Sequence, residues 1–250
     1  MASSVLPRGW TVPGKISARF GTQAGRQRAM IQDGHLVLVT HLVPAPSVVE
    51  RTPALFWRAP DGTWKSTSEA RGGLIGLREL VDAYHKRSIE LESQVDHARR
   101  ASDYFAVLQG VGPVLRAARH LHRALQEARE GIPDDKDIIS LRDAAGEVER
   151  TCEIVQADAK SGLDYTAARR AEELSETSDR IARSSYRLNL IAALFLPISA
   201  LGSVFGVNLT HGLEGVAAPF LFWAFVVGAF IVGFIVRAAV KEPELAPRQP

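Results

Sequence analysis

The 250-residue sequence predicts an α+β fold, in which a small amino-terminal β/α domain leads into one very long helix and then into a two-helix membrane hairpin. Three observations predict this fold. Turn signals separate short apolar runs before residue 70, helical periodicity begins near residue 74, and two uncharged apolar stretches cover 188–205 and 216–236. Each stretch is close to the ~20 apolar residues that cross a hydrocarbon core of ~30 Å. The membrane hairpin therefore limits what the protein can be.

Overall composition separates few classes, because 46% hydrophobic residues, 23% charged residues and a net charge of +2 suit many soluble proteins. The chain contains no dense Lys/Arg patch with interleaved aromatic residues, so we expect no nucleic-acid partner. The single cysteine, Cys152, excludes an intramolecular disulfide and a cysteine-based zinc site. The motifs of phosphate-binding loops, zinc proteases and serine hydrolases do not occur, so we expect no enzyme.

The amino-terminal part is expected to contain a flexible arm over 1–26, which has little periodicity, and a small cytoplasmic α/β domain over 27–133. Two β-hairpins begin this domain, because turns with Asp-Gly match the twist of paired strands. The turns are Asp33-Gly34 and Pro60-Asp61-Gly62. The paired runs are 29–32 with 35–42, and 55–58 with 63–66. Four short strands predict a small sheet.

Helical spacing of apolar residues follows from Leu74 to Ala128 and predicts a helical hairpin that lies against the sheet. We place the break between its two helices at Gly110-Val111-Gly112-Pro113, because proline and glycine interrupt helices. The apolar positions are Leu77, Leu80, Val81, Tyr84, Ile89, Leu91, Phe105, Leu108, Val114, Leu115, Ala118, Leu121, Leu125 and Ala128.

A cytoplasmic stalk helix is predicted over 134–187, because Pro133-Asp134-Asp135 has the proline and the acidic residues of a helix start. No proline follows until Pro197, so the helix is expected to continue into the first span, 188–207. The whole helix would be roughly 110 Å long at ~1.5 Å per residue. A helix of this length requires packing against copies of itself or against the preceding helices.

The expected orientation follows from the basic residues that flank the spans. The outer loop, 208–215, contains no Lys or Arg, and positive charge marks cytoplasmic ends. The flanking residues are Arg180, Arg183 and Arg187 before the first span, and Arg237 and Lys241 after the second span, 216–236. Both termini, including the tail 237–250, are therefore expected in the cytoplasm, with the loop on the periplasmic side of a bacterial inner membrane.

One face of the first span gathers small and polar side chains, while large apolar residues such as Leu194 and Phe205 point the other way. Polar groups that face lipid would lack hydrogen-bond partners, so this polar stripe should face protein or water. The residues alone leave two explanations open: a wet pore, or close packing of helices through small residues. The polar stripe consists of Ser185, Asn189, Ala192, Leu196, Ser199 and Ser203.

The segment 194–208 resembles the signature of the CorA superfamily of divalent cation channels. It contains Phe195-Leu196-Pro197-Ile198-Ser199, like the Phe-x-Pro-(Leu/Ile)-(Ser/Thr) run of that family, and ends in Gly206-Val207-Asn208 where the family has Gly-Met-Asn. The resemblance covers about residues 134–240 and is only architectural before them. It implies a homopentamer that conducts divalent cations passively, with Mg²⁺ preferred and Zn²⁺, Co²⁺ or Ni²⁺ as other candidate ions.

The resemblance also implies roles for individual residues. Gly206, Val207 and Asn208 would form the selectivity filter, where a ring of Asn208 amides would hold a hydrated ion. Glu214 and His211 in the outer loop would attract cations. The pore would be lined by Ser203, Ser199, Leu196, Ala192, Leu188 and Ser185, with the two leucines as apolar constrictions.

Three further expectations concern the regulation of the channel, the identity of the transported ion and a different class of function. Glu147 or Asp164 on the stalk is a candidate for an intersubunit regulatory Mg²⁺ site. Val207 and the few acids of the outer loop leave open a transporter similar to the ZntB branch, which would carry zinc with proton coupling. A membrane signalling protein with the same scaffold, opened by a ligand of its amino-terminal domain, is the alternative of another class.

Overall fold

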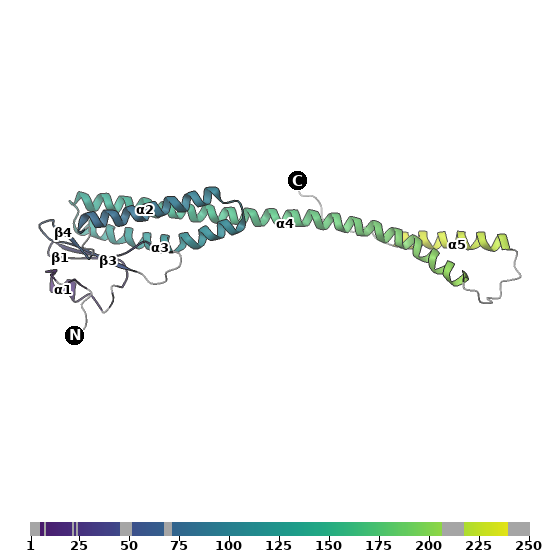
Figure 1. The fold of residues 1–250 in the computed structure, drawn as a ribbon, viewed down its shortest axis with the longest axis horizontal. Coiled ribbons are helices and arrows are strands. Elements are labelled where there is room, and N and C mark those ends of the chain that lie inside the picture. The colour runs from purple at the N-terminus through teal and green to yellow at the C-terminus, as the bar shows by residue number, and fades with distance from the viewer. Residues whose placement is uncertain are drawn as a thin grey trace. The chain divides into compact units, whose positions relative to one another are not determined.

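The computed structural model describes residues 6–7, 9–21, 23, 25–45, 52–67, 72–206 and 218–239. The chain divides into two compact units, residues 1–167 and residues 168–250. The α+β class is confirmed, with a small amino-terminal sheet and a long helix (Figure 1).

The sheet has four antiparallel strands in the order β1-β2-β3-β4. The strands are β1 (Arg28–Gln32), β2 (His35–His41), β3 (Pro53–Arg58) and β4 (Trp64–Ser66). Both predicted hairpins are present, and in the first turn Asp33 and Gly34 have φ of 50° and 76°. Positive φ at both central residues is the geometry that Asp-Gly tolerates best in a two-residue hairpin turn.

Both faces of the sheet are buried, and each face has its own core. Leu36, Leu38 and Phe56 face the helices, whereas Val37 and Trp57 belong to a second cluster on the other face. The second cluster is completed by described residues of the segment 1–26, which includes the short helix α1 (Gly14–Ser17). The residues from this segment are Ile16, which is 2% exposed, and the partly buried Trp10, Val12 and Phe20. The segment that we expected to be a flexible arm thus contains residues that cover the second face of the sheet. A few large side chains are enough to bury this face, and they need no periodic spacing in the sequence.

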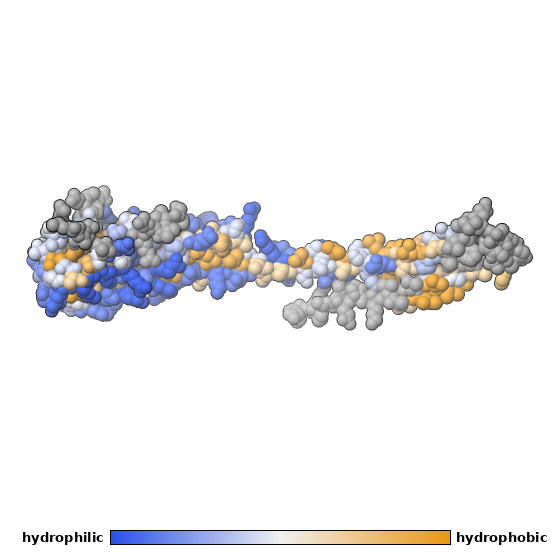
Figure 2. Space-filling view, turned by 90° about the horizontal axis from the view of Figure 1, so that it is seen from below, coloured by the Kyte–Doolittle hydropathy of each residue, from blue (hydrophilic) through white to orange (hydrophobic). Residues whose placement is uncertain are grey.

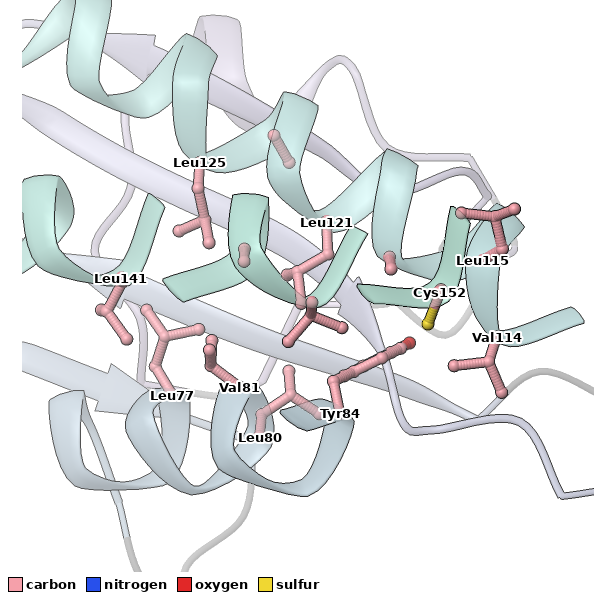
Figure 3. Packing of buried hydrophobic residues seen from close by; sticks show 14 of the residues in the cluster. Leu77, Leu80, Val81, Tyr84, Val114, Leu115, Leu121, Leu125, Leu141 and Cys152 are labelled. Carbon is pink, nitrogen blue, oxygen red and sulfur yellow. The ribbon is translucent and has the colours of Figure 1, made fainter. Parts of the chain in front are cut away.

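Three helices pack side by side over the first face of the sheet: α2 (Leu74–His97), α3 (Ala101–Gly131) and the first part of α4 (Lys136–Gly206) (Figure 1). Their apolar residues meet in one core, in which the ring of Tyr84 of α2 points toward Val114 of α3 and Cys152 of α4 (Figure 3). The hydroxyl of Tyr84 donates to the carbonyl oxygen of His41 at 3.1 Å, which ties α2 to the end of β2.

The predicted break at residues 110–113 is wrong, because α3 continues through Pro113. Gly112 has no Cβ to collide with the following proline ring, and Val111 and Val114 are buried, so packing outweighs the hydrogen bond that proline removes. Gly110 serves close packing, since a Cβ there would lie 3.1 Å from Cδ2 of Leu91.

The chain instead turns between α2 and α3 at residues 98–100. The spacing of apolar residues in the sequence did not reveal this turn. The Asp103 carboxylate accepts hydrogen bonds from the backbone N–H of Arg99 at 3.1 Å and of Arg100 at 2.9 Å. These bonds satisfy backbone donors at the start of α3. Ile89 and Phe105 are exposed, although we expected them on the apolar face of the helical hairpin.

The long helix α4 begins at Lys136, because Asp135 is its cap and not its first turn. Oδ1 of Asp135 accepts from the backbone N–H of Asp137 at 3.0 Å and of Ile138 at 3.2 Å. Oδ2 of the same carboxylate accepts from Nε of Arg58 at 2.6 Å, which ties the helix start to β3. Gly162 of α4 lies under the ring of Tyr104 of α3, so this glycine allows close approach of the two helices.

Candidate pore-lining face of α4

The polar stripe predicted on the first span lies on α4, which continues through Pro197 and ends at Gly206. In the single chain its polar members are exposed, and so are Leu188 and Leu196. Ala192 is half-buried. The exposed polar residues are Ser185, Asn189, Ser199 and Ser203. The stripe is therefore open to a partner or to water.

The opposite face of α4 packs against α5 (Ala218–Ala239), which lies beside it in the same unit (Figure 1). A Cβ placed on Gly233 of α5 would lie 2.9 Å from Cδ1 of Leu194, so a larger residue there would require this side chain to move. Leu190, Leu194 and Ile198 are half-buried on this side of α4, and Ala229 of α5 is buried. α5 thus covers part of the apolar side of α4 and leaves the polar stripe uncovered.

A second exposed stripe on α4 was missed by the sequence reasoning. Leu174, Ile181 and Leu188 recur every seven residues and are 71%, 61% and 64% exposed. The spacing of seven was the signal that could have revealed this heptad stripe, since it is typical of helices that pack on other helices. The heptad stripe begins after the part of α4 that α2 and α3 cover, where the last fully buried residue is Ala159.

Large apolar side chains gather on the face of the second unit that Figure 2 shows, and exposed ones lie on α5 and on the neighbouring part of α4. The exposed ones on α5 include Phe220, Trp223, Phe230, Phe234 and Ile235. Over the part of the chain that the structure describes, no helix combines the length and the apolar character needed to cross a membrane.

The residues predicted to form the filter begin at the boundary of the described chain. Gly206 is the last residue of α4. Val207, Asn208, His211 and Glu214 lie outside the described residues.

The candidate regulatory acids Glu147 and Asp164 are both exposed on α4. They are separated by roughly 25 Å along the helix at ~1.5 Å per residue, so one chain cannot bring them to one ion. Within the described ranges, no three His, Cys, Asp or Glu side chains gather as metal ligands. A regulatory ion on these residues would need carboxylates from another copy.

Two other stalk acids have partners on α3. Glu153 Oε1 accepts from Nη2 of Arg119 at 2.6 Å, and this bond raises the pKa of the arginine. Glu149 Oε2 lies 2.7 Å from Nδ1 of His122. These acids therefore join α4 to α3.

Comparison with known proteins adds independent information. The model of the family "CorA-like Mg2+ transporter protein" matches residues 74–241. The solved structure of the full-length CmaX protein has a TM-score of 0.50 at 14% identity, covering 86% of this chain and 78% of that chain. The CorA magnesium transporter from Methanocaldococcus jannaschii has a TM-score of 0.39 at 11% identity, covering 88% of this chain and 80% of its own. No curated protein matches. At these identities the likeness to CmaX shows a shared fold alone.

Proposed function

Since this chain belongs to the family of CorA-like Mg²⁺ transporter proteins, we propose that it forms a homopentameric divalent cation channel of a bacterial inner membrane. Members of this family are ion transporters and not enzymes. The proposed channel prefers Mg²⁺, which moves passively down its electrochemical gradient through a central pore lined by α4.

The observation that carries the proposal is the exposed polar stripe of α4, on the side that α5 leaves uncovered. Hydroxyl and amide groups in a membrane need protein or water as partners. Because two helices per chain cannot enclose a conduit, copies of the chain must surround the axis that the stripe faces. Leu188 and Leu196 then form apolar rings, and Ser185, Ala192, Ser199 and Ser203 line the wider parts.

The heptad stripe supports self-association. Leu174, Ile181 and Leu188 lie largely in solvent in one chain, and packing against the same residues of other copies would bury them. The stripe leads into the polar stripe at Leu188, so one assembly can cover both.

The membrane placement rests on the complete sequence. Between residues 188 and 236 the only formally charged residue is Glu214, and the basic residues lie outside these limits. In this placement both chain termini lie in the cytoplasm, and Glu214 and His211 lie at the outer mouth, where they attract cations.

The proposed filter consists of Gly206, Val207 and Asn208, directly after the end of α4. Mg²⁺ gives up its water reluctantly and prefers oxygen ligands, so a ring of neutral amide oxygens holds the ion through its hydration shell. Glu147 or Asp164 provides the intersubunit regulatory Mg²⁺ site in this proposal.

Mg²⁺ influx into liposomes that contain the purified protein tests the assignment. We expect Asn208→Ala to lose most of the influx, while Ser175→Ala, an exposed stalk residue outside the polar stripe, keeps it. Equal influx through wild type and Asn208→Ala would contradict the filter. No Mg²⁺ influx through wild type at any imposed gradient would contradict the channel.

Val207 favours a second candidate, a zinc transporter similar to the ZntB branch, because this residue replaces the methionine of the usual filter. Zn²⁺ influx that follows an imposed pH gradient, with no Mg²⁺ influx, would support this candidate over the Mg²⁺ channel.

A further inference from the structure

The charges along the second unit's part of α4 change character at Asp179. Up to Arg180, two arginines pair with acids on the same face of the helix: Nε of Arg169 lies 3.1 Å from Glu173, and Nη2 of Arg180 lies 3.8 Å from Glu176. After Asp179, no Asp or Glu occurs until Glu214. The last basic residues before the apolar stretch therefore have no acidic neighbours that follow them.

Arg183 and Arg187 are the two basic residues of this acid-free segment that follow the last ion pair, between Arg180 and Glu176. They are exposed, and among the described residues no carboxylate lies within ion-pair distance of either guanidinium. Residues four apart lie on the same face of a helix, where two like charges repel each other. An anion bound between the two arginines would attract both guanidinium groups and offset their mutual repulsion.

The arginine pair faces away from the polar stripe. Ser185 lies two residues from each arginine, which places it about 160° around the helix from both. Leu194, against which Gly233 of α5 packs, lies seven residues after Arg187 and within about 20° of it. In an assembly whose polar stripes face a common axis, the pair therefore points to the outer perimeter.

We propose that Arg183 and Arg187 bind the phosphate of an anionic phospholipid headgroup in the cytoplasmic leaflet. This inference rests on the proposed function, which places the membrane boundary near Leu188, one residue after Arg187. Guanidinium groups bind phosphate with two parallel hydrogen bonds, and anionic headgroups concentrate at this depth. The lipid would stabilise the point where α4 enters the membrane.

Thermal unfolding of the full-length protein in detergent, with added dioctanoyl phosphatidylglycerol, tests the site. The variants are Arg183→Gln with Arg187→Gln, and the matched control is Arg169→Gln with Arg170→Gln, a second arginine pair farther from the apolar stretch. At about 1 kcal/mol for each basic residue near a lipid surface, we expect the first variant to need roughly 30-fold more lipid for the same stabilisation. The control should respond like wild type.

Lysine at both positions, Arg183→Lys with Arg187→Lys, keeps the charge and should retain part of the response. Equal stabilisation of wild type and the double glutamine variant by phosphatidylglycerol would overturn the proposal. So would an equal response of wild type to dioctanoyl phosphatidylcholine, or to inorganic phosphate at the same concentration, because the lipid headgroup would then not be the ligand.

Mg²⁺ influx into liposomes distinguishes this inference from the proposed function. Influx through wild type together with an unchanged lipid response of the double glutamine variant overturns the lipid site alone. Absence of influx in liposomes with and without phosphatidylglycerol overturns the channel on which the lipid site rests.

Discussion

Replacing Gly162 by alanine should destabilise the amino-terminal unit, although alanine is the better helix former. Glycine in a helix interior costs about 1 kcal/mol relative to alanine, so helix propensity alone predicts stabilisation. The structure predicts the opposite, because the added Cβ would lie 2.5 Å from Cζ of Tyr104, inside the contact distance of its ring.

The magnitude follows from three contributions. Helix propensity stabilises by about 1 kcal/mol. Overpacking of the Tyr104 ring costs about 1–3 kcal/mol. Displacement of the ring also breaks the hydrogen bond from its hydroxyl to the carbonyl oxygen of Ala98, 3.2 Å long, which costs about 1 kcal/mol. The net destabilisation is about 1–3 kcal/mol.

Thermal unfolding of the full-length protein, followed by tryptophan fluorescence, measures the effect. For a unit of this size about 1 kcal/mol corresponds to 2–4 °C, so Gly162→Ala should lower Tm by roughly 2–12 °C. Tyr104→Leu removes the ring, and in that background the same glycine substitution should raise Tm because only helix propensity remains. A rise in Tm in the wild-type background, or a fall of equal size in both backgrounds, would refute the reasoning.

Two further predictions concern the polar contacts at the helix starts. Asp135→Ala should destabilise the protein by about 3–5 kcal/mol in chemical denaturation, since it leaves the largely buried guanidinium of Arg58 unpaired and removes the helix cap. Asp135→Asn should cost less because it keeps the cap and loses only the charge; equal costs would contradict the contribution of the cap, and a negligible cost of Asp135→Asn would contradict the importance of the charge. The pKa of the Asp103 carboxyl is lowered chiefly by the backbone N–H of Arg100, so its stabilising effect is complete above the unfolded-chain pKa of about 3.9 and is lost as pH falls through the lower folded value. Asp103→Asn should therefore reduce the loss of stability on acidification, and an unchanged acid limb of the stability curve would show that the carboxylate has no such role.

The sheet could be predicted because its signals are local. Asp33-Gly34 accepts the positive φ of a tight turn, and the apolar runs on both sides must then pair in one register. The helical hairpin was predicted in kind but not in detail. Gly110 and Pro113 have low helix propensity, yet α3 continues through them because the residues next to them, Val111 and Val114, are buried against the surrounding helices.

The polar stripe could be found from the sequence because helical periodicity alone puts Ser185, Ser199 and Ser203 on one face. Which helix covers the other face could not be found in this way, because the approach of Gly233 to Leu194 joins residues of two separate helices. The pairing of Glu149 and Glu153 with α3 was hidden for the same reason. In the sequence these acids look like Glu147 and Asp164, which form no ion pair among the residues that the structure describes.

The sequence by itself determined the α+β class, the two hairpins, the unbroken course of α4 and the polar stripe, because each depends on residues close together in the chain. Only the tertiary structure decided where α2 ends, that residues from the first segment close the sheet, which acids are paired and which side of α4 remains open. These features depend on contacts between residues far apart in the chain, whose packing energies exceed local helix propensities of about 1 kcal/mol or less per residue, or about 3 kcal/mol at a proline.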